Sequence, residues 1–80
     1  MTVTHKIKQR REELRYSRPQ LAEEVGVGWE TIKAYETKGA IPSLPVALKL
    51  AKVLELSMEE LFTLEEIEQM EKPETDNDIA

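Results

Sequence analysis

The segment Gln20–Glu36 constrains the fold of this chain most, because two stretches with helical spacing meet at a single glycine. Apolar residues that repeat every three or four positions lie on both sides of this junction: Leu21, Ala22, Val25, Ile32 and Tyr35. Gly26 adopts the left-handed backbone conformation at little cost, so it can end the first helix and turn the chain. We therefore expect two helices joined by a tight turn, the second beginning near Gly28.

The flanking sequence also predicts helices, and no segment alternates between apolar and polar residues as a strand does. Ser17 with Gln20, and Ser57 with Glu60, have the pattern of a capping box at a helix start. The five expected helices begin near His5, Ser17, Gly28, Ser43 and Ser57, and the first extends to about Arg15. The fourth is the most apolar, and its stripe is expected at the centre of the core: Leu44, Ala47, Leu48 and Ala51. The predicted fold class is all-α.

Length and composition limit what the chain can be. Eighty residues allow one domain with a small core. With no cysteine, the sequence offers no disulfide framework and no thiolate metal site. No apolar run approaches the roughly 20 residues of a membrane span, and the first residues lack the apolar stretch of a signal peptide. We expect a helical domain over residues 4–63 and an acidic, partly disordered extension over residues 64–80. We also expect a cytoplasmic location and a bacterial or phage-encoded origin.

The net charge of −5 conceals an uneven distribution along the chain. Residues 1–58 hold ten Lys and Arg against seven Asp and Glu, whereas residues 59–80 hold one against nine. The first part can therefore face a polyanion. The acidic part is expected to act as a solubilising tail, with repulsion of non-specific polyanions as the alternative. Leu64, Ile67 and Met70 place an apolar face at its start, which can extend the fifth helix or contact a second subunit.

A set of short motifs runs through the chain without large gaps: Ile7-Lys8, Arg11-Glu12, Ser17, Leu21-Ala22-Glu23, Val25-Gly26-Val27, Thr31-Ile32, Tyr35-Glu36, Pro42-Ser43-Leu44, Leu50-Ala51 and Glu59-Glu60-Leu61-Phe62. In this register the chain resembles the phage repressor and Cro family of helix-turn-helix domains, also called the xenobiotic-response-element type. The resemblance implies a compact five-helix, lambda-repressor-like fold, two-fold dimers, and a third helix that lies in the major groove of DNA.

The resemblance assigns some positions to the architecture and others to the DNA backbone. Arg11 and Glu36 match the positions where family members form an ion pair between the first and third helices. Arg18 matches a phosphate-contacting position at the start of the second helix, where the fork of an arginine can bind phosphate with two hydrogen bonds. The alternative for Arg18 is a solvated side chain. The expected phosphate-binding residues are Arg18, Gln20, Thr31, Lys38 and the backbone at Leu44.

The residues expected to read bases are Trp29, Glu30, Lys33 and Ala34. The third helix contains no Arg, Gln or Asn, the residue types that commonly read guanine and adenine. Glu30 can instead accept a hydrogen bond from the amino group of cytosine, and Lys33 can donate to guanine. Trp29 and Ala34 can contact thymine methyl groups. For Trp29 the alternative is packing against the second helix or contact with a protein partner.

Together these features predict a sequence-specific, double-stranded-DNA-binding transcription regulator, in the first instance a homodimeric repressor of a palindromic operator. Two alternatives stay open: a helix-turn-helix domain that binds a protein partner or antagonist, and an antitoxin that binds both protein and DNA. We expect no enzymatic activity, cofactor or metal ion, since no paired nucleophile and base and no phosphate-cradling glycine loop occur. The only histidine, His5, lies in a polar segment and is expected to be solvated.

Overall fold

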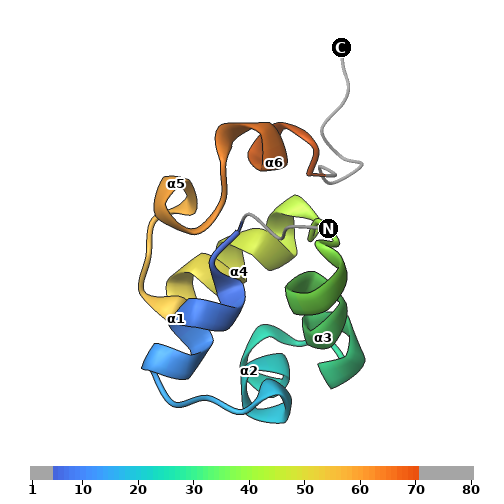
Figure 1. The fold of residues 1–80 in the computed structure, drawn as a ribbon, viewed down its shortest axis with the longest axis vertical. Coiled ribbons are helices and arrows are strands. Elements are labelled where there is room, and N and C mark those ends of the chain that lie inside the picture. The colour runs from blue at the N-terminus through green and yellow to red at the C-terminus, as the bar shows by residue number, and fades with distance from the viewer. Residues whose placement is uncertain (1–4, 71–80) are drawn as a thin grey trace.

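The computed structural model describes residues 5–70, and within them it contains six helices and no strand (Figure 1). The helices are α1 (Ile7–Glu13), α2 (Arg18–Val25), α3 (Trp29–Lys38), α4 (Leu44–Leu54), α5 (Met58–Leu61) and α6 (Leu64–Glu68). The expected all-α class is confirmed, and the arrangement is consistent with a lambda-repressor-like fold. None of these described helices combines the length and the hydropathy that crossing a membrane requires.

The local signals for helix ends were predicted correctly. The Ser17 hydroxyl accepts the Gln20 amide, and the Gln20 side chain returns to the Ser17 amide, so α2 begins with a complete capping box. Ser57 and Glu60 form the same reciprocal pair at the start of α5. Gly26 ends α2 in the left-handed region, at φ 88° and ψ 30°. These signals lie within four residues of the ends they define, which is why the sequence alone reveals them.

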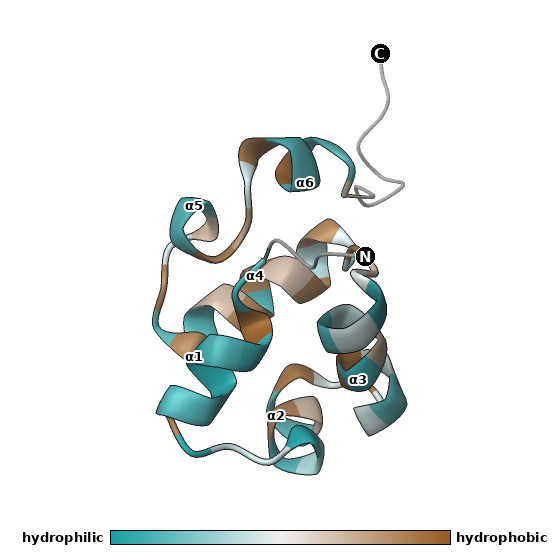
Figure 2. Cartoon of the chain, in the orientation of Figure 1, coloured by the Kyte–Doolittle hydropathy of each residue, from teal (hydrophilic) through white to brown (hydrophobic). Residues whose placement is uncertain are grey.

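The core lies between α4 and the helices around it, since α4 contacts α1, α2 and α5, while α2 also packs on α3. In Figure 2, α4 carries apolar colours along much of its length, whereas α1 is mostly hydrophilic on its visible side. The buried apolar residues come from nearly every element: Ile7, Leu21, Ala22, Val25, Ile32, Tyr35, Ala47, Leu50, Ala51, Leu54, Leu61, Phe62 and Met70.

The buried face of α4 differs from the expected stripe. Leu48 is 52 % exposed and Leu44 is only half-buried, so the expectation that both are central to the core is wrong. The residues that are buried are Ala47, Leu50, Ala51 and Leu54. This set has the same helical spacing, rotated around the axis, and it is selected because α4 is covered by three other helices at once. Spacing alone does not distinguish the two faces of a helix this apolar.

The start of the described chain also differs from expectation. His5 is only 6 % exposed, and its ring makes a T-shaped contact with Phe62 at a centroid distance of 5.9 Å, which corrects the expectation of a solvated histidine. The α1 helix begins at Ile7 and ends at Glu13, inside the expected range of residues 5–15. Arg15 has a φ of 64°, a left-handed conformation that does not continue a right-handed helix.

The α6 helix is a separate element and does not extend α5. Phe62 is extended, at φ −125° and ψ 154°, and therefore ends α5. Thr63 and Glu66 then form a third capping box, with hydrogen bonds of 3.1 Å and 2.8 Å. Met70 beyond it is buried with the core. A segment assigned by sequence to the acidic extension thus contributes to the packed domain, while residues 71–80 lie outside the described part of the chain.

Candidate nucleic-acid interface

The junction between α2 and α3 depends on the backbone conformation of Gly26. Its amide donates to the Ala22 carbonyl at 2.8 Å, which closes the last turn of α2. A Cβ at this position would meet no atom within 4 Å, so space does not require the glycine. The φ of 88° requires it, because a side chain is strained in this region. Gly28 is extended and becomes the N-cap of α3 without a side-chain hydrogen bond.

The expected base-reading residues lie in the first two turns of α3. Trp29 is 45 % exposed, Glu30 and Lys33 are exposed, and Ala34 is half-buried. Glu30 lies in the first helical turn, where its carboxylate interacts favourably with the positive end of the helix dipole. This local role is available to Glu30 without any DNA. The helix therefore exposes the indole of Trp29, the carboxylate of Glu30 and the ammonium group of Lys33, whereas the methyl group of Ala34 is half-buried.

Trp29 also borders α2. An open cleft of about 490 Å³ lies between the starts of the two helices and is lined by Arg11, Ser17, Arg18, Pro19 and Trp29. The indole thus has one edge toward the first turn of α2 and nearly half of its surface in solvent. This position is compatible with all three interpretations of Trp29 from the sequence: contact with DNA bases, packing on the second helix, and contact with a protein partner.

The start of α2 offers few free backbone donors to an anion. The Gln20 amide donates to the Ser17 hydroxyl at 3.1 Å, and the Ser17 amide donates to Gln20 Oε1 at 2.8 Å. Pro19 has no N–H to donate. The capping box also occupies the side-chain oxygen of Gln20 and leaves its NH2 group as the donor for a ligand. Binding of phosphate at this helix end therefore depends mainly on the side chain of Arg18.

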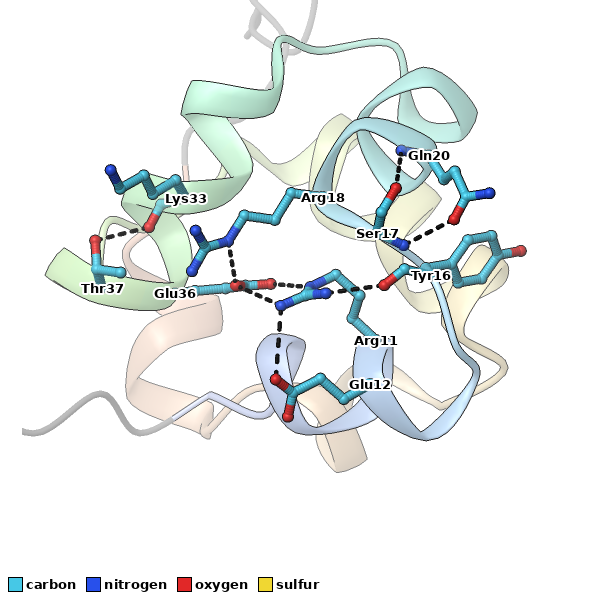
Figure 3. A network of polar contacts seen from close by, with 9 residues as sticks. All are labelled: Arg11, Glu12, Tyr16, Ser17, Arg18, Gln20, Lys33, Glu36 and Thr37. Carbon is cyan, nitrogen blue, oxygen red and sulfur yellow. Dashed lines mark hydrogen bonds and ion pairs between the residues drawn. The ribbon is translucent and has the colours of Figure 1, made fainter.

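A buried carboxylate links α1, α2 and α3 (Figure 3). Glu36 accepts a two-pronged contact from Arg11, from Nε to Oε2 at 2.6 Å and from Nη2 to Oε1 at 3.1 Å. Arg18 donates from Nε to the same Oε1 at 3.0 Å. The third donor of Arg11, Nη1, reaches the Tyr16 carbonyl at 2.8 Å. The Arg11–Glu36 pair implied by the resemblance is present, and it is joined by an arginine that the sequence assigned to phosphate alone.

Electrostatics hold this cluster charged. The hydrogen bond to Glu36 raises the pKa of the Arg11 guanidinium, and burial, which opposes the charge, does not outweigh it. The Glu36 side chain has no exposed surface, and the Arg11 side chain is 10 % exposed. Around the buried carboxylate itself two arginines face one anion, and Arg11 also lies 3.9 Å from the exposed carboxylate of Glu12. The more exposed of the two arginines is Arg18, at 28 %. No local sequence signal could have revealed the second arginine, since Arg18 and Glu36 are 18 residues apart.

The remaining expected phosphate-binding residues lie at other ends of helices. Lys38 is exposed in the last turn of α3, and Thr31 is half-buried in the first. Leu44 begins α4 after Ser43, which makes no side-chain cap hydrogen bond, so the first amides of α4 keep their donors available. The Thr37 hydroxyl donates back to the Lys33 carbonyl at 2.8 Å and is directed along the helix. Within residues 5–70, no group of three or more His, Asp or Glu side chains could hold a metal ion.

A family model described as helix-turn-helix matches residues 7–61, which comprise α1 to α5. The chain belongs to the helix-turn-helix family. This membership agrees with the glycine-centred junction of α2 and α3 and with the all-helical packing around it. It gives the chain a helix-turn-helix DNA-binding domain of the type found in transcriptional regulators.

Curated relatives of this helix-turn-helix chain carry related names. It is 42 % identical over 64 residues to the Bacillus subtilis protein "Uncharacterized HTH-type transcriptional regulator YgzD", across 80 % of this chain and 97 % of the relative. It is 37 % identical over 67 residues to an uncharacterized HTH-type transcriptional regulator of Archaeoglobus fulgidus, across 84 % and 94 %. Identity to the "Cryptic phage CTXphi transcriptional repressor RstR" of Vibrio cholerae is 28 % over 61 residues, across 76 % of this chain and 54 % of that protein.

Proposed function

We propose that the protein is a transcriptional repressor that binds a palindromic operator as a homodimer, with α3 in the major groove. The observation that carries this proposal is the position of the cationic and exposed side chains around the α2–α3 junction. Arg18 holds the exposed charge of the buried cluster, and Trp29, Glu30 and Lys33 extend from the adjacent start of α3. The name of the Vibrio cholerae relative supports repression as the direction of control.

Within this proposal the contacts divide into two classes. Arg18, Gln20, Thr31, Lys38 and the backbone at Leu44 contact phosphates and set the position of the domain on the duplex. The residues at the start of α3 contact base edges: Trp29, Glu30, Lys33 and Ala34. In a two-fold dimer the two copies of α3 enter half-sites about 34 to 36 Å apart, one turn of the double helix. Occupation of such a site within a promoter excludes RNA polymerase, which accounts for repression.

The direct experiment is a titration of the full chain against duplex DNA from upstream of its own gene. Fluorescence anisotropy at about 50 mM salt, where backbone contacts are strongest, should show saturable binding. A scrambled duplex of equal length is the control, and it should bind at least about 1,000-fold more weakly if readout is specific. Absence of binding to any duplex under these conditions would contradict the proposal.

The second candidate function is recognition of another protein through the same face. It is favoured by Trp29, because an indole that is 45 % exposed beside a shallow cleft is a common anchor of protein interfaces. Purification of the chain from its native host distinguishes the two functions. A stoichiometric partner whose binding is abolished by Trp29→Ala, together with no binding to DNA, would favour the protein-binding module. A partner together with operator binding would favour the antitoxin.

A further inference from the structure

The buried carboxylate of Glu36 holds its two arginines in different ways. Arg11 uses all of its donor nitrogens within the protein: Nε and Nη2 on Glu36, and Nη1 on the Tyr16 carbonyl. Arg18 uses only Nε, at 3.0 Å from Glu36 Oε1. Figure 3 shows Arg18 approaching the carboxylate from a different side than Arg11. The Nη1 and Nη2 groups of Arg18 therefore remain available as a planar pair of donors.

The surroundings of Arg18 suit an anion at those two groups. The Arg18 side chain is 28 % exposed and lines the cleft that it shares with Pro19 and Trp29. The apolar neighbours offer no competing carboxylate. At the start of α2 the Ser17 and Gln20 amides are occupied by the capping box and Pro19 has no N–H, so the Arg18 guanidinium is the main donor that this helix end offers to an anion.

We propose that Glu36 is a positioning residue for DNA binding, which orients Arg18 so that its Nη1 and Nη2 groups grip one backbone phosphate. This inference rests on the proposed DNA-binding function. By holding Nε, the carboxylate fixes the plane of the guanidinium and removes rotamer freedom that a free arginine would lose on binding. The opposite edge of the guanidinium then presents two parallel N–H donors, the geometry that matches two phosphate oxygens. Glu36 thus serves the fold through Arg11 and the ligand through Arg18.

This arrangement predicts that lysine cannot replace Arg18, although lysine keeps the charge. A lysine has one ammonium nitrogen, which must serve both Glu36 and the phosphate, whereas an arginine can contact them through different nitrogens. We expect Arg18→Lys to bind operator DNA about tenfold more weakly than the wild-type chain. Arg18→Gln loses the charge as well, and the slope of log K against log[salt] should become shallower by about 0.9 for each domain bound. Lys52→Gln in the last turn of α4 removes one exposed charge that does not line this cleft, and it should change neither quantity.

The experiment is an anisotropy titration of these variants against upstream duplex DNA between about 50 and 200 mM salt, with melting temperatures measured for each variant. If Arg18→Lys binds like the wild-type chain, Arg18 acts as a point charge and the positioning role is overturned. If Arg18→Gln retains the wild-type affinity and slope, Arg18 does not contact DNA and the inference is overturned while the proposed function stands. If the wild-type chain binds no duplex, the proposed function fails, and this inference fails with it.

A measurement on the free protein tests the Glu36 contact without DNA and without destabilising the fold. The Arg18 Nε–H signal in a proton–nitrogen correlation spectrum should be protected from exchange with water, because its proton is held by a buried carboxylate. The Arg15 Nε–H signal is the matched reference, since Arg15 is exposed and lies in the adjacent turn. Equal exchange rates for the two signals would overturn the positioning role. On addition of operator DNA, the Nη protons of Arg18 should also become visible.

Discussion

At the scale of single residues, Glu36 is the charge whose loss should cost the fold most. Replacement by alanine would leave the Arg11 guanidinium, at 10 % exposure, without its buried partner, and with only the exposed Glu12 carboxylate 3.9 Å away. Breaking a buried pair in this way costs about 3 to 5 kcal/mol, mainly because the remaining charge stays buried. We expect Glu36→Ala to lower the free energy of unfolding by that amount, measured by urea denaturation followed by circular dichroism.

The chain provides a control of the same chemistry at the surface. Arg10 and Glu13 form an ion pair at 3.1 Å, with side chains 25 % and 50 % exposed. Water screens such a pair, so its contribution is about 1 kcal/mol or less. Glu13→Ala should therefore leave the urea midpoint close to that of the wild-type chain. Similar losses for Glu13→Ala and Glu36→Ala would show that burial does not set the value of the Arg11–Glu36 pair.

The buried imidazole of His5 predicts a pH dependence of stability. Burial lowers the pKa of His5 below 6.5, and the carboxylates of Glu66 and Glu36 oppose this effect without reversing it. Within the described residues neither ring nitrogen makes a hydrogen bond of good geometry, and the nearby backbone of Tyr35 favours the protonated ring without offsetting burial. Because the unfolded chain binds this proton more readily, its contribution to stability is complete above pH 6.5 and decreases as pH falls toward the folded pKa.

We expect the free energy of unfolding to decrease between about pH 7 and pH 5, and His5→Phe to remove part of that decrease. Phenylalanine keeps an aromatic ring against Phe62 and has no proton to gain. The informative quantity is the difference between the two stability curves, since the carboxylates that do not face His5 titrate alike in both chains. Parallel curves over this interval would mean that His5 does not couple protonation to folding.

At the scale of helices, the caps offer a matched pair of serines. Ser17 and Ser43 are both N-caps with extended backbone and both precede a helix with proline in its first turn, but only the Ser17 hydroxyl accepts an amide hydrogen bond. Loss of such a bond costs about 1 kcal/mol. Ser17→Ala should therefore lower the free energy of unfolding by that amount, and Ser43→Ala should lower it by only a few tenths. Equal effects in thermal denaturation would contradict the assignment of the capping energy to the hydroxyl.

The same distinction explains how much of the fold could be predicted from the sequence. Helix ends are determined by side chains three or four residues away, so the caps at Ser17 and Ser57 and the turn at Gly26 were predicted correctly. The burial of His5 and the exposure of Leu48 depend on partners that are distant in the chain, and both expectations were wrong. Helix ends can therefore be predicted from residues within one helical turn, whereas the face of a helix that is buried depends on how several helices pack together.

The candidate site follows the same rule. The family register placed Trp29, Glu30 and Lys33 on α3, and the structure shows all three exposed. It also indicated the pair of Arg11 and Glu36, because both residues lie at positions that match the family pattern. The contact between Arg18 and Glu36 was missed, because it depends on the angle at which α2 meets α3 rather than on either sequence segment. The base-reading and phosphate-binding roles themselves stay predictions.

At the scale of the whole molecule, DNA binding depends on how charge is distributed along the chain. Residues 1–58 carry an excess of three positive charges, and residues 59–80 an excess of eight negative charges, so the overall charge of −5 is unfavourable for a polyanion ligand. Long-range repulsion of this kind acts over about 10 Å at moderate salt and is largely screened. Contacts with phosphates act differently, because each one releases a condensed counterion from DNA. The local basic surface, and not the net charge, should therefore determine the salt dependence.

A homodimer with about four to six phosphate contacts on each subunit should give a slope of log K against log[salt] of about −7 to −11, since each contact contributes about −0.9. A monomer on one half-site should give about half of that value. We expect the steeper slope in anisotropy titrations from about 50 to 200 mM salt, together with a two-to-one stoichiometry in sedimentation equilibrium on operator DNA. A scrambled duplex should show a similar sign of salt dependence at much weaker affinity, because phosphate contacts do not depend on sequence. A slope of about −5 or shallower with one chain per duplex would contradict the dimer, because each phosphate contact of a dimer releases a counterion and steepens the slope.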